Sequence, residues 1–199
     1  MAIPYVLDAA HWLAGRAVDP GGFAIDATVG NGYDTLFLAQ AVGAQGRVVG
    51  FDVQEEALDE TRRRVQADAP EASLRLVHAG HETMADHLSK RDCGTVDAVM
   101  FNLGYLPGGD RSITTEPETT CRALDTSVNL LRPGGVVTVV AYTGHDGGAE
   151  EARAVESWVA ARPDDAFRAL SYQLLNQTND PPRLYAVEKR EGHASPSAE

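Results

Sequence analysis

The stretch Gly22-Phe23-Ala24-Ile25-Asp26-Ala27-Thr28-Val29-Gly30-Asn31-Gly32 joins a short apolar run to a turn that contains two glycines. Residues 22–26 predict a buried β-strand, and residues 34–42 predict the helix that follows the turn. Gly30 and Gly32 allow the backbone to fold tightly and to approach a ligand closely. The N-terminal end of the helix directs its partial positive charge at the same place. The order strand, glycine turn, helix therefore predicts a binding site at the start of a βα unit.

The same alternation of strand and helix continues outward along the chain. Further strands are predicted at 47–52, 74–78, 96–102 and 136–142, and further helices at 5–15, 54–67, 82–88, 115–130 and 149–161. We expect threonines to cap the helix over 115–130, and Arg132-Pro133-Gly134-Gly135 to stop it. Alternating strands and helices imply a parallel sheet covered by helices on both faces.

Two closing strands, 167–176 and 183–188, lack a helix between them and should pair antiparallel at the edge of the sheet. The predicted fold class is therefore α/β, a three-layer Rossmann-like arrangement with a seven-stranded, mostly parallel sheet and an antiparallel terminal hairpin. A chain of 199 residues, 43% of them hydrophobic, suits one domain over residues 1–191. The small polar residues 192–199 predict a disordered tail.

The formal net charge of −12 argues against a protein that coats nucleic acid through unspecific phosphate contacts. An RNA substrate stays possible, because a local cluster such as Arg62-Arg63-Arg64 can face phosphates; the alternative is a solvated helix face. No apolar run is long enough to span a bilayer and no signal peptide is visible, so we expect no membrane partner and a cytoplasmic protein. The two cysteines lack metal-ligand spacing, and we expect no metal site.

Asp52 stands at the end of the predicted strand 47–52. A carboxylate in that position reaches the two ribose hydroxyls of an adenosine cofactor, which serves NAD and S-adenosylmethionine (SAM) equally well. The NAD fingerprint requires a third glycine where Thr35 stands. This departure counts against an NAD-dependent oxidoreductase, which stays an alternative.

Three more loops follow strands and should meet at the same carboxyl edge of the sheet. His81 or Glu82, after the third strand, is expected to contact an adenine, although Glu82 can equally well start the next helix. Asn102, after the fourth strand, can hold an amine by accepting hydrogen bonds from its N–H groups, and Tyr105 can stack on a base. The alternative for this loop is a plain glycine-rich connection. His145, after the fifth strand, can touch substrate or relay a proton, or it can be incidental.

These loops together resemble one known family, the YtqB-like rRNA methylases, also called MnmM. The resemblance covers about residues 3–189. It is carried by Asp26 to Gly32, Gly80-His81-Glu82, Phe101-Asn102-Leu103-Gly104-Tyr105-Leu106-Pro107-Gly108-Gly109-Asp110, Tyr142-Thr143-Gly144-His145 and Asn176 to Pro182. The stretch from Phe101 to Asp110 is its most specific part.

The resemblance implies a class I SAM-dependent methyltransferase that acts on tRNA. Family members methylate the exocyclic amine of 5-aminomethyl-2-thiouridine at the wobble position. Carried over by position, the SAM contacts would be Asn31, Asp52, Gln54, His81 and Glu82, beside the turn residues Asp26, Thr28, Gly30 and Gly32. Asn102 and Tyr105 would face the modified uridine, and His145 completes the expected catalytic set.

Three other functions stay open on this fold. They are a methyltransferase of another RNA, a methyltransferase of a small-molecule or protein amine, and a module that binds SAM without catalysis. The acidic composition favours a small amine. A homodimer is one way in which a chain of this size can build a wider face for RNA.

Overall fold

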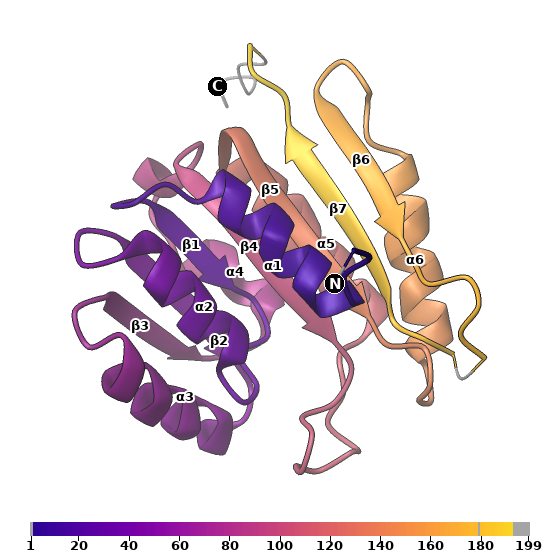
Figure 1. The fold of residues 1–199 in the computed structure, drawn as a ribbon, viewed down its shortest axis with the longest axis horizontal. Coiled ribbons are helices and arrows are strands. Elements are labelled where there is room, and N and C mark those ends of the chain that lie inside the picture. The colour runs from indigo at the N-terminus through magenta and orange to yellow at the C-terminus, as the bar shows by residue number, and fades with distance from the viewer. Residues whose placement is uncertain (1, 179, 193–199) are drawn as a thin grey trace.

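The computed structural model describes residues 2–178 and 180–192, and these form a seven-stranded sheet between two layers of helices (Figure 1). The strand order is β3-β2-β1-β4-β5-β7-β6. Strands β1 to β5 pair in parallel, whereas β7 pairs antiparallel with both β5 and β6. The predicted fold, with its antiparallel terminal pair, is confirmed. The predicted tail extends into residues 193–199, which lie outside the described residues.

The bounds of the elements lie close to the predicted ones. The helices are α1 (Val6–Ala17), α2 (Tyr33–Val42), α3 (Glu55–Asp68), η1 (His81–Thr83), α4 (Met84–His87), η2 (Lys90–Asp92), α5 (Pro117–Leu130) and α6 (Gly148–Ala160). The strands are β1 (Phe23–Asp26), β2 (Arg47–Asp52), β3 (Ser73–His78), β4 (Val96–Leu103), β5 (Leu131–Ala141), β6 (Phe167–Tyr172) and β7 (Arg183–Lys189). Over the described residues, no helix has the length and apolar character needed to cross a membrane.

The alternation of side chains along the central strands divides the core in two. In β1, Ile25 packs toward α5 and α6, whereas its neighbour Ala24 packs toward α1 and α2. Val99 and Met100 of β4 divide in the same way. Because both faces are covered, these strands consist mainly of buried apolar residues, with Asp26, Asp97 and Asn102 as the polar exceptions. Figure 1 shows α1, α2 and α3 in front of the sheet and α5 and α6 behind it.

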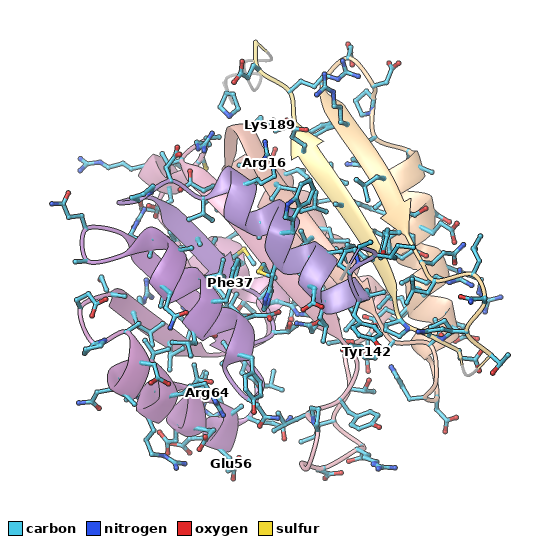
Figure 2. All side chains as sticks on the ribbon, viewed as in Figure 1. Arg16, Phe37, Glu56, Arg64, Tyr142 and Lys189 are labelled. Atoms are coloured by element: carbon cyan, nitrogen blue, oxygen red, sulfur yellow. The ribbon has the colours of Figure 1, made fainter. Side chains whose placement is uncertain are left out.

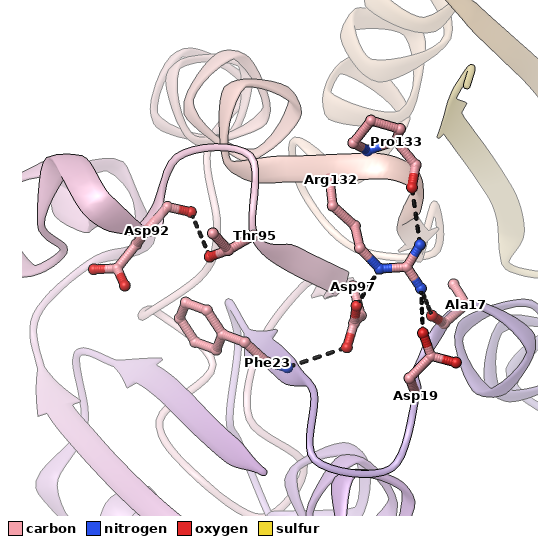
Figure 3. Close-up of polar contacts among 8 residues, drawn as sticks. All are labelled: Ala17, Asp19, Phe23, Asp92, Thr95, Asp97, Arg132 and Pro133. Carbon is pink, nitrogen blue, oxygen red and sulfur yellow. Dashed lines mark hydrogen bonds and ion pairs between the residues drawn. The ribbon is translucent and has the colours of Figure 1, made fainter. Parts of the chain in front are cut away.

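An ion pair between the buried Asp97 and the partly buried Arg132 lies at the amino-terminal edge of the sheet (Figure 3). Asp97, at the start of β4, accepts a hydrogen bond from the backbone N–H of Phe23 at 3.1 Å and pairs with Arg132. Arg132 also donates to the carbonyl of Ala17 at 2.7 Å and reaches Asp19 at 3.1 Å. Both partners of the pair are thus satisfied, as a buried charge requires. The contact ties β1, β4, β5 and the end of α1 together.

The prediction that threonines cap α5 is wrong. The N-cap of this helix is Glu116, which makes no side-chain capping bond, and Pro117 occupies the first turn. The hydroxyls of Thr115 and Thr120 instead donate to the carboxylate of Glu151 on α6, each at 2.7 Å. A buried carboxylate attracts donors more strongly than a solvent-exposed helix end does.

Helix α5 ends at Leu130, as expected from the stop at residues 132–135, but the next strand begins earlier than predicted, because these four residues already belong to β5. Val96 pairs with Leu131, and Ala98 pairs with Val136, so four residues of β5 lie opposite a single residue of β4. This irregularity accommodates the proline and the glycines within the strand. At the other end of the sheet, β6 stops at residue 172 rather than at the expected 176.

Gly32, in the turn after β1, is packed closely against Thr61. It has φ 78° and ψ 15°, and an added Cβ would lie 2.4 Å from the Oγ1 of Thr61. Gly147 has a similar left-handed backbone conformation before α6, with φ 81° and ψ −19°, but no heavy atom lies within 4 Å of the position that its Cβ would take.

We expect Gly147→Ala to lower the free energy of unfolding by about 1–2 kcal/mol through backbone strain. Gly32→Ala should lower it by about 1–3 kcal/mol more through the clash. Urea unfolding of both variants measures this, and equal losses would contradict the packing.

Candidate active site

The predicted site loops meet at the carboxyl edge of the sheet around one cavity of about 920 Å³. This volume lies within the range of about 300–1,000 Å³ that is typical of small-molecule sites. The predicted site residues that line it are Thr28, Gly30, Asn31, Asp52, Gln54, His81, Glu82, Asn102, Tyr105 and His145. Two predicted residues, Asp26 at the end of β1 and Gly32 in the turn, do not line the cavity. The sequence thus located the cavity, while the individual contacts to a ligand stay predictions.

Asp26 organises the glycine turn from below. It is fully buried, and its carboxylate accepts hydrogen bonds from the backbone N–H of Thr28 at 3.1 Å and from the hydroxyl of Thr35 at 2.5 Å. Burial, together with the negative charge of Asp34, raises the pKa of Asp26 from 3.8 to about 7. Asp26 therefore acts on the cavity through the turn that it holds.

Asp52 connects the turn to the end of β2. Its carboxylate accepts hydrogen bonds from the backbone N–H groups of Gly30 at 2.8 Å and of Gln54 at 2.9 Å. Burial raises the pKa of this carboxyl, although the backbone donors act in the opposite direction. Because each carboxylate oxygen has two lone pairs, Asp52 keeps acceptor capacity on the cavity side.

His81 is nearly buried, with 6% of its surface exposed, and its ring packs edge-on against Phe101 at 5.6 Å. Burial lowers the pKa of this imidazole. Its Nε2 lies 3.4 Å from the hydroxyl of Thr120, which itself donates to the buried carboxylate of Glu151. Burial raises the pKa of Glu151. This cluster could not be predicted from local sequence patterns, because His81, Thr120 and Glu151 lie in three separate helices, η1, α5 and α6.

The loop after β4 folds over the turn. The side-chain amide of Asn31 donates to the carbonyl of Pro107 at 3.4 Å, and Leu106 lies against Gly30. The backbone N–H of Thr115 donates to the carbonyl of Gly104 at 3.1 Å, which closes the base of the loop. In Figure 1 this loop extends beyond the sheet below β4. It therefore forms one wall of the cavity.

Aromatic groups line the mouth of the cavity. Tyr105 contacts His145 edge to face at 5.8 Å, and the exposed guanidinium of Arg111 lies over the Tyr105 ring at 5.2 Å. His145 Nδ1 lies 2.9 Å from the carbonyl of Asp146, whereas its Nε2 is buried and has no hydrogen-bond partner among the described residues. A carbonyl only accepts, so Nδ1 carries the proton and Nε2 of the neutral ring is an acceptor.

Asn102 is held from two sides. Its backbone N–H donates to the hydroxyl of Thr28 at 2.6 Å, and its side-chain Nδ2 donates to Asp34. Asp34 also contacts His11 Nε2 at 2.6 Å. Sequence reasoning missed Asp34 and His11, although Asp34 lines the cavity. Asp34 could have been predicted as a site residue, because it lies in the first turn of the helix that follows the glycine turn.

The arginine cluster on α3 is compensated within its own helix. Arg62 pairs with Asp59 at 2.5 Å, and Arg63 and Arg64 pair with Glu60 at 3.0 and 3.4 Å. These ion pairs favour the solvated-face interpretation over a phosphate-binding cluster.

A family profile and a curated relative both match most of this chain. The sequence profile of the family described as "Putative rRNA methylase" matches residues 48–188. The "tRNA (mnm(5)s(2)U34)-methyltransferase, chloroplastic" of Arabidopsis thaliana is 32% identical over 190 residues, which are 92% of this chain and 69% of that protein.

Two solved structures agree over nearly their whole length. A protein from Clostridium thermocellum described as a "putative rRNA-methylase" is 40% identical with a TM-score of 0.89, covering 95% of this chain and all of that one. A protein from Streptococcus mutans described as "a putative methyltransferase", solved with S-adenosylhomocysteine, is 34% identical with a TM-score of 0.83, covering 94% of this chain and 99% of that one.

The raised pKa of Asp26 predicts a pH dependence of stability. A folded-state pKa above the unfolded value means that the folded protein binds the proton more tightly. The contribution of the Asp26 carboxyl group to stability is therefore full below pH 3.8 and is lost as the pH rises through about 7.

We expect the unfolding free energy of the wild type, relative to Asp26→Asn, to fall between pH 3.8 and about pH 7. Urea unfolding at closely spaced pH values measures the difference, with Asp59→Asn as the control for an exposed aspartate. Parallel curves for the wild type and Asp26→Asn would contradict the assignment.

Proposed function

The chain belongs to the family described as "Putative rRNA methylase", and on that premise we propose that it methylates the exocyclic amine of 5-aminomethyl-2-thiouridine at the tRNA wobble position. The chain is a SAM-dependent methyltransferase with a Rossmann-like fold. The name of the Arabidopsis thaliana relative states this wobble modification for that protein, and it supports tRNA as the substrate here.

The cavity fits SAM. Asp52 at the end of β2 keeps acceptor capacity for the ribose hydroxyls, and Gln54 lies beside it. Gly30, with φ 52°, brings its backbone to the wall of the cavity where a methionine carboxylate would lie. His81 and Glu82 line the part that would take the adenine. When bound, SAM supplies an electrophilic methyl group.

The observation that carries the proposal is the side-chain oxygen of Asn102. This Oδ1 is buried and has no hydrogen-bond partner among the described residues, although Asn102 lines the cavity. A buried acceptor without a partner is costly, so such atoms mark places where a ligand donates. An amine that donates one N–H to Oδ1 has its lone pair directed elsewhere, which orients it as a nucleophile.

The amine must also lose its charge, because an alkyl amine is largely protonated in water. Transfer into a cavity that excludes water favours the neutral form. The Nε2 of His145 is an acceptor at the mouth of the same cavity and can take a proton. Tyr105 supplies a ring on which a base can stack, and Arg111 beside it offers a positive charge to a phosphate. These roles are part of the proposal.

A second candidate is a small-molecule amine as the acceptor. The net charge of −12 favours it, because a strongly acidic chain repels phosphates in general. Both candidate functions use the same groups of the cavity. They differ in whether the amine belongs to a tRNA or to a small molecule, so one methylation experiment can distinguish them.

We expect the purified protein to transfer labelled methyl groups from SAM to bulk tRNA from cells that lack the final wobble-uridine methylation. Nucleoside mass spectrometry should find the product as 5-methylaminomethyl-2-thiouridine. The control is tRNA from cells that carry the complete modification, which should accept no label. Intact SAM binding by calorimetry without transfer to tRNA would overturn the tRNA assignment, and label in a pool of small amines would favour the second candidate.

We further expect Asn102→Ala to lower kcat by about ten- to a hundredfold, because the substrate amine loses the group that orients it. SAM affinity, measured by calorimetry, should change far less. Asn129→Ala is the matched control, since Asn129 is exposed on α5 and its side chain bonds to the carbonyl of Asp125 in the same helix. Equal losses of kcat and of SAM affinity in Asn102→Ala would contradict the proposed role.

A further inference from the structure

The two polar atoms of the Asn102 side chain have different surroundings. The Nδ2 donates to Asp34, while the Oδ1 is buried and has no hydrogen-bond partner in the part of the chain that the structure describes. The backbone N–H is held separately by Thr28 at 2.6 Å. The position of the residue is therefore fixed by its backbone, and the orientation of its amide is fixed by Asp34.

A carboxylate imposes this orientation because it only accepts hydrogen bonds. With Asp34 on one side, the amide must turn its nitrogen toward the carboxylate and its oxygen away from it. A neutral amide at position 34 would bond to either end of Asn102. The negative charge at this position thus decides which atom of the Asn102 amide is turned toward Asp34 and which is turned away from it.

Asp34 is itself held firmly. It is 7% exposed in the first turn of α2, and its other oxygen lies 2.6 Å from Nε2 of His11 on α1. The His11 ring stacks on Phe37 with ring centroids 4.2 Å apart and an interplanar angle of 1°. Figure 2 labels Phe37 on α2, beside α1. The chain His11, Asp34, Asn102 therefore links two helices to the end of β4.

We propose that Asp34, held by His11, is a positioning residue that fixes Asn102 with its Oδ1 toward the substrate and thereby selects a nucleophile that carries N–H donors. This inference rests on the proposed function and gives a structural reason for its substrate class, an amine that donates an N–H to the Asn102 oxygen. Such an amine arrives as a cation, and the acidic group behind Asn102 attracts it. A carboxylate or phosphate nucleophile would meet an acceptor and a like charge, both unfavourable.

The first test needs no substrate. In the nuclear magnetic resonance spectrum of ¹⁵N-labelled protein, the side-chain amide signals of Asn102 are assigned by their loss in Asn102→Asp. We expect one of its two protons to be shifted downfield and to exchange slowly with water, because it is bonded to a carboxylate. In Asp34→Asn this shift and protection should disappear. Retention of both in Asp34→Asn would overturn the proposal.

The second test is kinetic. We expect Asp34→Asn to lower kcat by about ten- to a hundredfold, with SAM affinity nearly unchanged. The double variant Asp34→Asn/Asn102→Asp reverses donor and acceptor, so that an acceptor oxygen again faces the cavity. Its kcat should exceed that of both single variants. A merely structural tie predicts no such rescue, and a double variant no better than the poorer single variant would overturn the proposal.

Asp92→Asn is the matched control for loss of a buried aspartate. Asp92 is 8% exposed and pairs with Arg47 at 2.5 Å, at the amino-terminal edge of the sheet, away from the cavity. This variant should lower stability and leave kcat unchanged. If the wild type transfers no methyl group to tRNA, the proposed function fails, whereas the spectroscopic test still decides the orientation of Asn102.

Discussion

The organisation of the site depends on one fully buried carboxylate, that of Asp26. A buried acceptor of this kind must be satisfied by donors, and here the donors are the backbone of Thr28 and the hydroxyl of Thr35. These two bonds fix the path of the chain from β1 into α2. The hydroxyl of Thr28 then accepts from the backbone of Asn102, and Asp34, next to Thr35, faces its side chain. The turn expected to hold the cofactor and the loop expected to hold the substrate therefore share one anchor.

The charge of the chain agrees with the ligands expected in the cavity. A net charge of −12 opposes broad binding of phosphates, but the sulfonium of SAM and an alkylammonium group are both cations. Asp34 and Asp52 line the cavity where such cations would lie, whereas Arg111 is an exposed positive group at its mouth. Acidic composition and an RNA substrate are thus compatible, provided that recognition is centred on the modified base.

Polar groups that stabilise the fold and polar groups available to a ligand lie at opposite edges of the same sheet. At the amino-terminal edge, Asp97 and Arg132 are paired and their remaining hydrogen-bonding groups contact backbone atoms. At the carboxyl edge, Asn102 Oδ1 and His145 Nε2 are buried without partners among the described residues. Unsatisfied polar atoms are unfavourable for folding, and two of the three such side-chain atoms among the described residues lie where a ligand is expected, whereas the third, Thr138 Oγ1, lies within β5 and does not line the cavity. The fully satisfied edge offsets part of this cost.

The order of strands and helices, the turn at Gly30 and Gly32, and the loops that line the cavity could all be predicted from the amino-acid sequence. Those features follow from hydrophobic periodicity and from backbone conformations that are local in the chain. Three other features emerged with the folded arrangement: residues 132–135 join β5, Thr120 donates to Glu151 rather than to a helix end, and Asn102 donates to Asp34. These contacts join residues 31 to 68 positions apart, or depend on the register between strands. Local sequence carries no record of such partners, because a hydrogen bond is directional and forms only where packing brings donor and acceptor together.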